Sequence, residues 1–147
     1  MKVVSNTSPL IGFAKIEQLS LLHHLFRTIT IPRTVYDEFF ENCTPAEETH
    51  FLAVSQECIE IVEVERLHLF SRRLDRGEQD VLTLALQEHA DIVLLDDRKA
   101  FNEAQDLKLE VASTRAVLKI AEERHLIRSY QEVEAMLRQQ QFYLPNY

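Results

Sequence analysis

The sequence has little glycine, proline and cysteine, and each shortage excludes a class of protein. Only 2 glycines and 4 prolines among 147 residues leave little room for flexible linkers or low-complexity tracts. Its 2 cysteines, Cys43 and Cys58, form no C-x-x-C pair, which argues against a disulfide scaffold or a zinc ribbon. The 6 histidines lack the H-E-x-x-H spacing of a zinc site, so we interpret them as surface or core residues.

Long apolar runs are missing as well. No run approaches the ~20 residues that a membrane-spanning helix needs, and the first residues are too poor in apolar side chains for a signal peptide. We therefore expect a cytoplasmic protein that does not contact a membrane. A chain of 147 residues can bury a real core, so we expect one domain over residues 1–147.

The net charge of −8 argues against a broad basic surface for nucleic acid. It does not exclude an enzyme that acts on nucleic acid. A cluster of metal-binding carboxylates makes a chain acidic by itself, and the bound cations reverse the local field.

The stretch from Ile92 to Asp97 organises the rest of the chain. Residues 92–95 are all apolar and are followed directly by Asp96 and Asp97. An unalternating apolar run is typical of a strand buried on both faces in a parallel sheet, and ligands bind outside the carboxyl ends of such strands. The two acids are either a helix N-cap with a solvated neighbour or part of a cation site.

Apolar periodicity and capping residues predict strands that alternate with helices. Such alternation indicates an α/β fold with a parallel sheet and right-handed crossovers. Because apolar and acidic residues alternate in the third strand, we expect that strand at the sheet edge. The predicted strands are Val3–Ser5, Ile29–Ile31, Ile59–Val64, Ile92–Leu95 and Glu110–Ala112, and the predicted helices run through Pro9–Ile16, Leu19–Phe26, Val35–Phe40, Pro45–Ser55, Arg66–Leu74, Val81–Leu86, Lys99–Leu107, Val117–Ala121 and Val133–Leu137.

Polar side chains recur beside the predicted strands. Asn6 follows the first strand, Glu38 lies in the helix after the second, and Asp80 opens the helix before the fourth. If they converge with Asp96 and Asp97, the mutual repulsion of the acids implies a bound divalent cation. Oxygen ligands favour Mg²⁺ or Mn²⁺ over zinc. Each residue also has an ordinary explanation: a solvated helix acid for Glu38, a helix-dipole partner for Asp80, and a strand-ending amide for Asn6.

Four stretches, taken in order, resemble the PIN domain family: 4–11, 31–38, 77–85 and 94–100. The resemblance covers nearly the whole chain and is strongest to short bacterial and archaeal PIN-like proteins. It implies a three-layer α/β/α fold with a parallel sheet of about four or five strands. It also implies a metal-dependent ribonuclease selective for single-stranded RNA, in which Mg²⁺ or Mn²⁺ activates water and neutralises charge on the phosphate. Many prokaryotic relatives are toxins held inactive by an antitoxin protein.

The resemblance also assigns site residues. It matches Glu38, Asp80 and Asp97 to catalytic acids, and Asn6, Asp80, Asp96 and Asp97 to the metal ligands. Ser8 matches the hydroxyl beside the metal, and Glu78 is a substitute for one of the acids. The departure from the family pattern is Asn6, which stands where the first aspartate is expected and brings no charge. The alternative function is therefore a weakened or inactive PIN-like domain that binds nucleic acid or protein.

Three further interpretations concern the binding of phosphates, the oligomeric state and an alternative protein class. Arg72, Arg73 and Arg76 either guide phosphates or form a solvated basic helix end. The apolar residues of the second helix exceed what one packed face requires, which favours a homodimer; they are Leu21, Leu22, Leu25 and Phe26. A phospho-acceptor receiver domain also uses an acid cluster on a parallel sheet, but it needs paired acids after the first strand rather than the fourth.

Overall fold

A five-stranded parallel sheet lies at the centre of the protein. We describe it from a computed structural model in which residues 1–66 and 68–147 are placed. The strands are β1 (Val3–Ser5), β2 (Ile29–Pro32), β3 (Ile59–Val62), β4 (Ile92–Leu94) and β5 (Val111–Ala112). They run in the order β3-β2-β1-β4-β5, and every neighbouring pair is parallel. The predicted parallel sheet, with the third strand at its edge, is confirmed.

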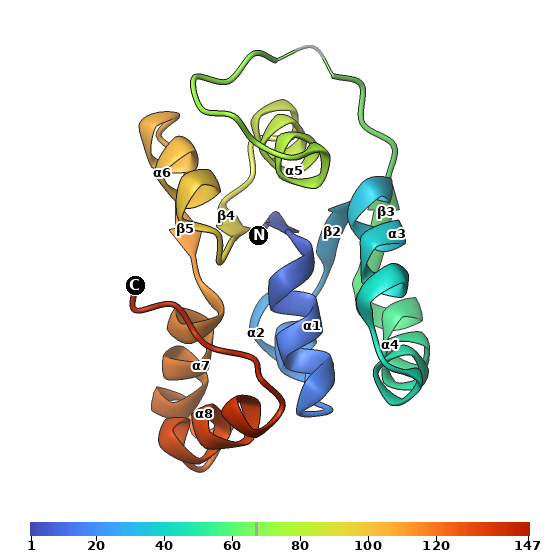
Figure 1. The fold of residues 1–147 in the computed structure, drawn as a ribbon, viewed down its shortest axis with the longest axis vertical. Coiled ribbons are helices and arrows are strands. Elements are labelled where there is room, and N and C mark those ends of the chain that lie inside the picture. The colour runs from blue at the N-terminus through green and yellow to red at the C-terminus, as the bar shows by residue number, and fades with distance from the viewer. Residues whose placement is uncertain (67) are drawn as a thin grey trace.

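Helices cover both faces of this sheet. They are α1 (Thr7–Lys15), α2 (Leu19–Phe26), α3 (Arg33–Asn42), α4 (Pro45–Cys58), α5 (Arg76–Gln87), α6 (Arg98–Asp106), α7 (Thr114–Glu123) and α8 (Tyr130–Gln139). In Figure 1, α5 and α6 lie above the row of strands, and α1, α2, α7 and α8 lie below it. The predicted three-layer α/β/α architecture is therefore confirmed. None of the helices in the described ranges is long and apolar enough to cross a membrane.

The central strands β1 and β4 are buried on both faces, which explains the consecutive apolar residues in each of them. Val4 pairs with Thr30 on one side and Val93 on the other, and Val4 and Val93 are fully buried. Helix α2 contributes Leu21 and Leu22 to the same core. The expectation that the α2 residues form surplus apolar surface is wrong, because Leu22 is 0% exposed within a single chain. Homodimerisation itself stays a prediction.

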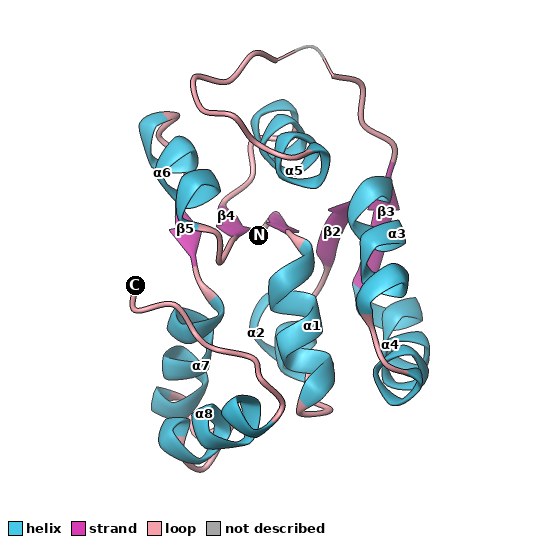
Figure 2. Ribbon diagram, in the orientation of Figure 1, coloured by secondary structure: helices cyan, strands magenta, loops and turns pink. Residues whose placement is uncertain are grey.

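The helix predicted over Arg66–Leu74 is wrong. Residues 63–66 and 68–75 form a non-helical connection from β3 to α5 (Figure 2), and Leu67 lies outside the described residues. The reason is a tertiary contact with α6. The buried Glu103 carboxylate accepts hydrogen bonds from the backbone N–H groups of Ser71 (2.9 Å) and Arg72 (3.1 Å) and from the Arg72 guanidinium (3.0 Å). These bonds stabilise a non-helical backbone at Ser71 and Arg72, although the local sequence favours a helix.

The segment after α8 packs on the body of the protein. Figure 1 shows it running from α8 past α7 toward β5. The ring of Phe142 lies on Gly12 of α1. At the far end, the Tyr147 hydroxyl donates to the carbonyl of Asp96, and the Ser113 hydroxyl donates to the carbonyl oxygen of Tyr147. The segment therefore joins α1, the β4 end and the start of α7.

Candidate active site

One cavity of about 480 Å³ lies beyond the carboxyl ends of β1 and β4, and we call it the acid cavity. Its lining comes from the start of α1, from α3, from the start of α5 and from the loop after β4, as expected where parallel strands end together. Four carboxyl groups and no lysine, arginine or histidine line it within the described residues. The lining residues are Asn6, Thr7, Ser8, Ile11, Glu38, Asn42, Glu78, Asp96, Asp97 and Phe142.

Asn6 lies where β1 passes into α1. Its backbone N–H donates to the carbonyl of Leu94 (3.0 Å), which fixes the end of β1 against β4. Its side chain is 8% exposed and makes no capping hydrogen bond to α1. The side chain lines the acid cavity, so a local strand-ending bond is not what holds it.

The two acids after β4 have different roles. Asp97 is the N-cap of α6, and its Oδ2 accepts from the backbone N–H of Ala100 (3.0 Å). Asp96 is bonded through both oxygens, with Oδ1 accepting from the Thr114 N–H and Oδ2 from the hydroxyls of Ser8 and Thr114, each at 2.7 Å. Asp96 thus ties α1 and α7 to the end of β4, while Asp97 has an oxygen that the cap does not use.

Glu38 reaches the acid cavity from the middle of α3. Its Oε2 accepts from the Thr7 hydroxyl at 2.9 Å. Its Oε1 lies against Gly77, where a Cβ would overlap it. Burial raises the pKa of Glu38 and outweighs the Thr7 hydrogen bond, and the negative charges of neighbouring acids raise the pKa further.

Glu78 closes the other side of the acid cavity. It forms a capping box with Asp75: Glu78 Oε1 accepts from the Asp75 N–H (3.0 Å), and Asp75 Oδ1 accepts from the Glu78 N–H (2.8 Å). Burial raises the pKa of Glu78 to about 7, against the lowering effect of the Asp75 hydrogen bond. The charges of Asp75 and Asp97 and a hydrogen bond to the Asp97 carboxyl contribute to the rise. Two carboxyl groups bond in this way only when one of them is protonated.

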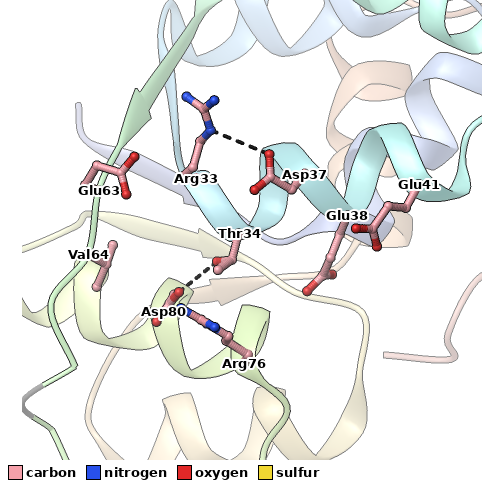
Figure 3. Close-up of a pocket in the computed structure, with 9 residues that line it drawn as sticks. All are labelled: Arg33, Thr34, Asp37, Glu38, Glu41, Glu63, Val64, Arg76 and Asp80. Atoms are coloured by element: carbon pink, nitrogen blue, oxygen red, sulfur yellow. Dashed lines mark hydrogen bonds and ion pairs between the residues drawn. The ribbon is translucent and has the colours of Figure 1, made fainter.

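Asp80 lies outside the acid cavity. Its carboxylate is 3% exposed and accepts from Arg66 Nε (2.9 Å) and from the Thr34 hydroxyl (2.8 Å). It lines a neighbouring cavity of about 390 Å³, the Arg33–Arg76 cavity, whose lining residues are drawn in Figure 3. Glu38 lines both cavities, so they are adjacent. The lining residues of the Arg33–Arg76 cavity are Arg33, Thr34, Asp37, Glu38, Glu41, Glu63, Val64, Arg76 and Asp80.

A family model described as a PIN domain matches residues 2–147 of this chain. The chain belongs to the PIN domain family. The fold is also similar to that of a PilT N-terminus domain protein from Sulfolobus solfataricus P2. That likeness has a TM-score of 0.64 at 12% identity and covers 82% of this chain and 93% of the other. No curated protein matches the chain in a comparison of sequences.

The site residues predicted for a PIN domain fall into two groups. The structure brings most of them to the acid cavity: Asn6, Ser8, Glu38, Glu78, Asp96 and Asp97. Asp80 lies in the adjacent Arg33–Arg76 cavity. Of the three arginines, Arg76 lines that second cavity, and Arg72 is ion-paired with Glu103 and Asp106 (3.0 and 2.8 Å).

Sequence reasoning missed several residues in or beside the acid cavity. Thr7 lies between Asn6 and Ser8 in the first PIN-like stretch, so its position was a usable signal. Gly77 was a weaker signal, because a glycine in a helical pattern lowers helix stability and invites a search for a packing reason. Phe142 gave no local signal, since only the packing of the chain brings it to α1. Ile11 and Asn42 were likewise missed.

The donor groups of the acid cavity suit the divalent cation that PIN domains use. Within the described ranges, no group of three histidine, cysteine, aspartate or glutamate side chains is close enough together to hold a metal ion. The donor atoms are nevertheless of the chemical type that a divalent cation binds. The Thr7 hydroxyl and the two helix caps engage one oxygen each of Glu38, Glu78 and Asp97, and loss of the proton between Glu78 and Asp97 would free the second oxygen of each of these two acids for a cation. Three such carboxylates with the amide of Asn6 form the all-oxygen set that Mg²⁺ or Mn²⁺ prefers.

Proposed function

We propose that this PIN domain is a Mg²⁺- or Mn²⁺-dependent ribonuclease that cleaves single-stranded RNA at the acid cavity. The observation that carries the proposal is the meeting of Glu38, Glu78 and Asp97 in one cavity without a basic side chain among its described lining. Three acids so placed repel one another unless protons or cations compensate them. A site of this kind recruits a divalent cation, and with it a phosphate group.

In this proposal Glu38, Glu78 and Asp97 hold the cation with the Asn6 amide. When bound, the cation supplies charge neutralisation at the phosphate and an activated water. The chain itself fixes the acids. Thr7 orients Glu38, the α6 cap orients Asp97, and the capping box of α5 orients Glu78.

Asp96 and Asp80 are positioning residues in this scheme. Both oxygens of Asp96 accept hydrogen bonds from Ser8 and Thr114, and the charge of Asp80 is compensated by its ion pair with Arg66. Their assignment as metal ligands stays a prediction of the resemblance. The contacts favour Glu78 over Asp80 as the third acid of the site.

A second candidate function has one observation in its favour. Asn6 gives the cavity one negative charge fewer than an aspartate would give. A PIN domain weakened in this way binds RNA or protein without cleaving it. Measuring cleavage separates the two functions.

The test uses a labelled single-stranded RNA of mixed sequence with Mn²⁺, with Mg²⁺ and with EDTA. We expect cleavage with either cation and none with EDTA, and at least tenfold slower cleavage by Asp97→Asn. Asparagine is also a good N-cap, so this variant keeps α6 intact. Glu123→Gln, an exposed acid on α7, is the matched control. Absence of cleavage under every condition, or full activity of Asp97→Asn, would contradict the proposal.

The toxin role and the antitoxin partner are proposals that follow from family membership. A toxin ribonuclease expressed alone should slow the growth of a bacterial host, whereas the Asp97→Asn variant should not. An antitoxin would act by covering the acid cavity. Growth that is equally slow with both variants would mean that the toxicity does not arise at this site.

A further inference from the structure

The acid cavity has an apolar side that a metal site does not need. Ile11 of α1 and Phe142 of the segment after α8 line it together with the four acids. Ser8 and Ile11 are three residues apart on α1, so they share one helix face, with the Ser8 hydroxyl toward Asp96 and the branched alkyl side chain of Ile11 farther along. The cavity therefore has a charged end and an apolar wall, which we call the Ile11–Phe142 wall.

The position of the Phe142 ring is defined by α1. A Cβ at Gly12 would lie 2.9 Å from Phe142 Cζ, which is closer than real Cβ contacts, so the ring lies where only glycine leaves room. Phe142 is half-buried and packs against the hydrophobic core. The ring is thus held beside the acids rather than projecting from a free segment.

The size and chemistry of the cavity fit a nucleotide better than an ion alone. Pockets that hold small organic ligands measure roughly 300–1,000 Å³, and the acid cavity measures about 480 Å³. A nucleobase is uncharged and has a flat apolar face, so the four carboxyl groups do not repel it. Stacking of a base on an aromatic ring is a common way to hold single strands.

We propose that the Ile11–Phe142 wall binds one unpaired nucleobase of the RNA whose phosphate lies at the acids. This inference rests on the proposed function and adds the way in which the strand is held. Asn42 is placed to contact the base edge. It lines the cavity and donates one amide hydrogen to the Glu38 carbonyl (2.8 Å), and an amide has a second hydrogen and an acceptor oxygen.

A purely structural role for Phe142 is the competing explanation. The ring would then only hold the segment after α8 against α1. The two explanations differ in one respect: a stacking ring contributes to affinity only when the base is present. RNA in which single bases have been removed therefore distinguishes them.

The experiment measures the affinity of a labelled single-stranded RNA by fluorescence anisotropy in Ca²⁺, with a gel to verify that the RNA stays intact. Oligonucleotides that each carry an abasic residue at a different position are compared with the complete one. We expect the wild-type protein to lose about 5- to 150-fold in affinity when one particular base is removed.

Phe142→Leu keeps an apolar side chain but removes the stacking face. It should lose affinity for complete RNA to a similar extent and show no further loss with the abasic RNA. Tyr143→Leu, a change in the neighbouring exposed ring, is the matched control and should behave as wild type. If Phe142→Leu does not fold, Gly12→Ala displaces the ring without removing it and should show the same pattern.

The inference is overturned if no abasic position matters, if RNA does not bind, or if Phe142→Leu weakens complete and abasic RNA equally. Its failure is distinguishable from failure of the proposed function. Binding that depends on one base, without cleavage, supports base binding at the Ile11–Phe142 wall and contradicts the proposed nuclease activity. Cleavage that does not depend on any single base supports the nuclease activity and contradicts base binding at the wall.

Discussion

The Glu38 carboxylate lies directly against the backbone of Gly77, with Oε1 in the space that a side chain at residue 77 would fill. This contact brings an acid from the middle of α3 to the first turn of α5, next to Glu78. It is possible only because residue 77 has no Cβ. The close approach of the two helices thus places two acids of the cavity side by side.

Gly77→Ala should therefore displace Glu38 while leaving the fold intact. We expect a roughly tenfold loss of Mn²⁺ affinity, the scale seen when a group that supports a metal ligand is changed. The measurement is the rise in melting temperature on adding Mn²⁺, since binding to the folded state alone stabilises it. Gln87→Ala, at an exposed position of the same helix, is the control. A Mn²⁺ shift equal to that of wild type would show that Glu38 does not contribute to the site.

Glu78 should make stability fall as pH rises. Its pKa is about 7 in the folded protein, above the ordinary value of 4.5. Between these values the unfolded chain loses the proton that the folded chain retains, so the destabilising effect is absent below about pH 4.5 and complete above about pH 7. Glu78→Gln preserves the capping box and should be more stable than wild type at pH 8 without metal. Chemical denaturation at pH 5 and pH 8 tests this, and an equal pH dependence of the two proteins would refute it.

The fold was largely predictable from the sequence because buried parallel strands have unbroken apolar runs. The run from Ile92 to Leu95 could be recognised as a strand without knowledge of distant contacts. The helix predicted over Arg66–Leu74 failed for the opposite reason. Its backbone is held by Glu103 on α6, a partner that no local pattern could reveal.

The site was predictable to the level of its elements but not of every side chain. Glu78 and Asp80 lie two residues apart on α5, so they point about 200° apart around the helix. Which of them faces the acid cavity depends on how α5 is rotated against the sheet, and that is set by the burial of Val81 and Leu82. The resemblance gave Glu78 only as a substitute for one of the acids and Asp80 as a main one, whereas Glu78 lines the acid cavity and Asp80 does not.

The 2 glycines of the chain are related to the site in the same way. The missing Cβ of Gly77 leaves space for the Glu38 carboxylate, and the missing Cβ of Gly12 leaves space for the Phe142 ring. Gly12 lies in the middle of α1, where glycine costs roughly 0.5–1 kcal/mol relative to alanine, and Gly77 lies in the first turn of α5. The presence of glycine at these two positions is explained by the side chains that pack against them, Phe142 at Gly12 and Glu38 at Gly77.

Asp96 and Asp97 should differ sharply in what they contribute to stability. Asp96→Ala leaves the Thr114 N–H and two hydroxyls without their acceptor, so we expect a loss of about 3 kcal/mol or more. Asp97→Ala removes one cap bond and should cost about 1 kcal/mol. Urea denaturation of the two variants tests the difference. Equal losses would mean that Asp96 is not the structural member of the pair.

Asn6→Asp should strengthen the site by restoring a fourth charge close to the cation. We expect Mn²⁺ to bind tenfold or more tightly and cleavage of single-stranded RNA to rise. Combining it with Asp97→Asn should cancel the gain in cleavage. Tighter metal binding without any cleavage would favour the binding-only function. No change in either quantity would remove Asn6 from the site.

The central claim is that Glu38, Glu78 and Asp97 hold a divalent cation, and a Mn²⁺ titration followed by calorimetry tests it most directly. Wild type, Glu78→Gln and Asp80→Asn are compared at pH 7.5, with melting temperatures to verify that each is folded. The account predicts saturable binding by wild type, at least tenfold weaker binding by Glu78→Gln, and affinity within about twofold of wild type for Asp80→Asn. No saturable binding by wild type would contradict the account, and so would loss of binding in Asp80→Asn with Glu78→Gln unchanged.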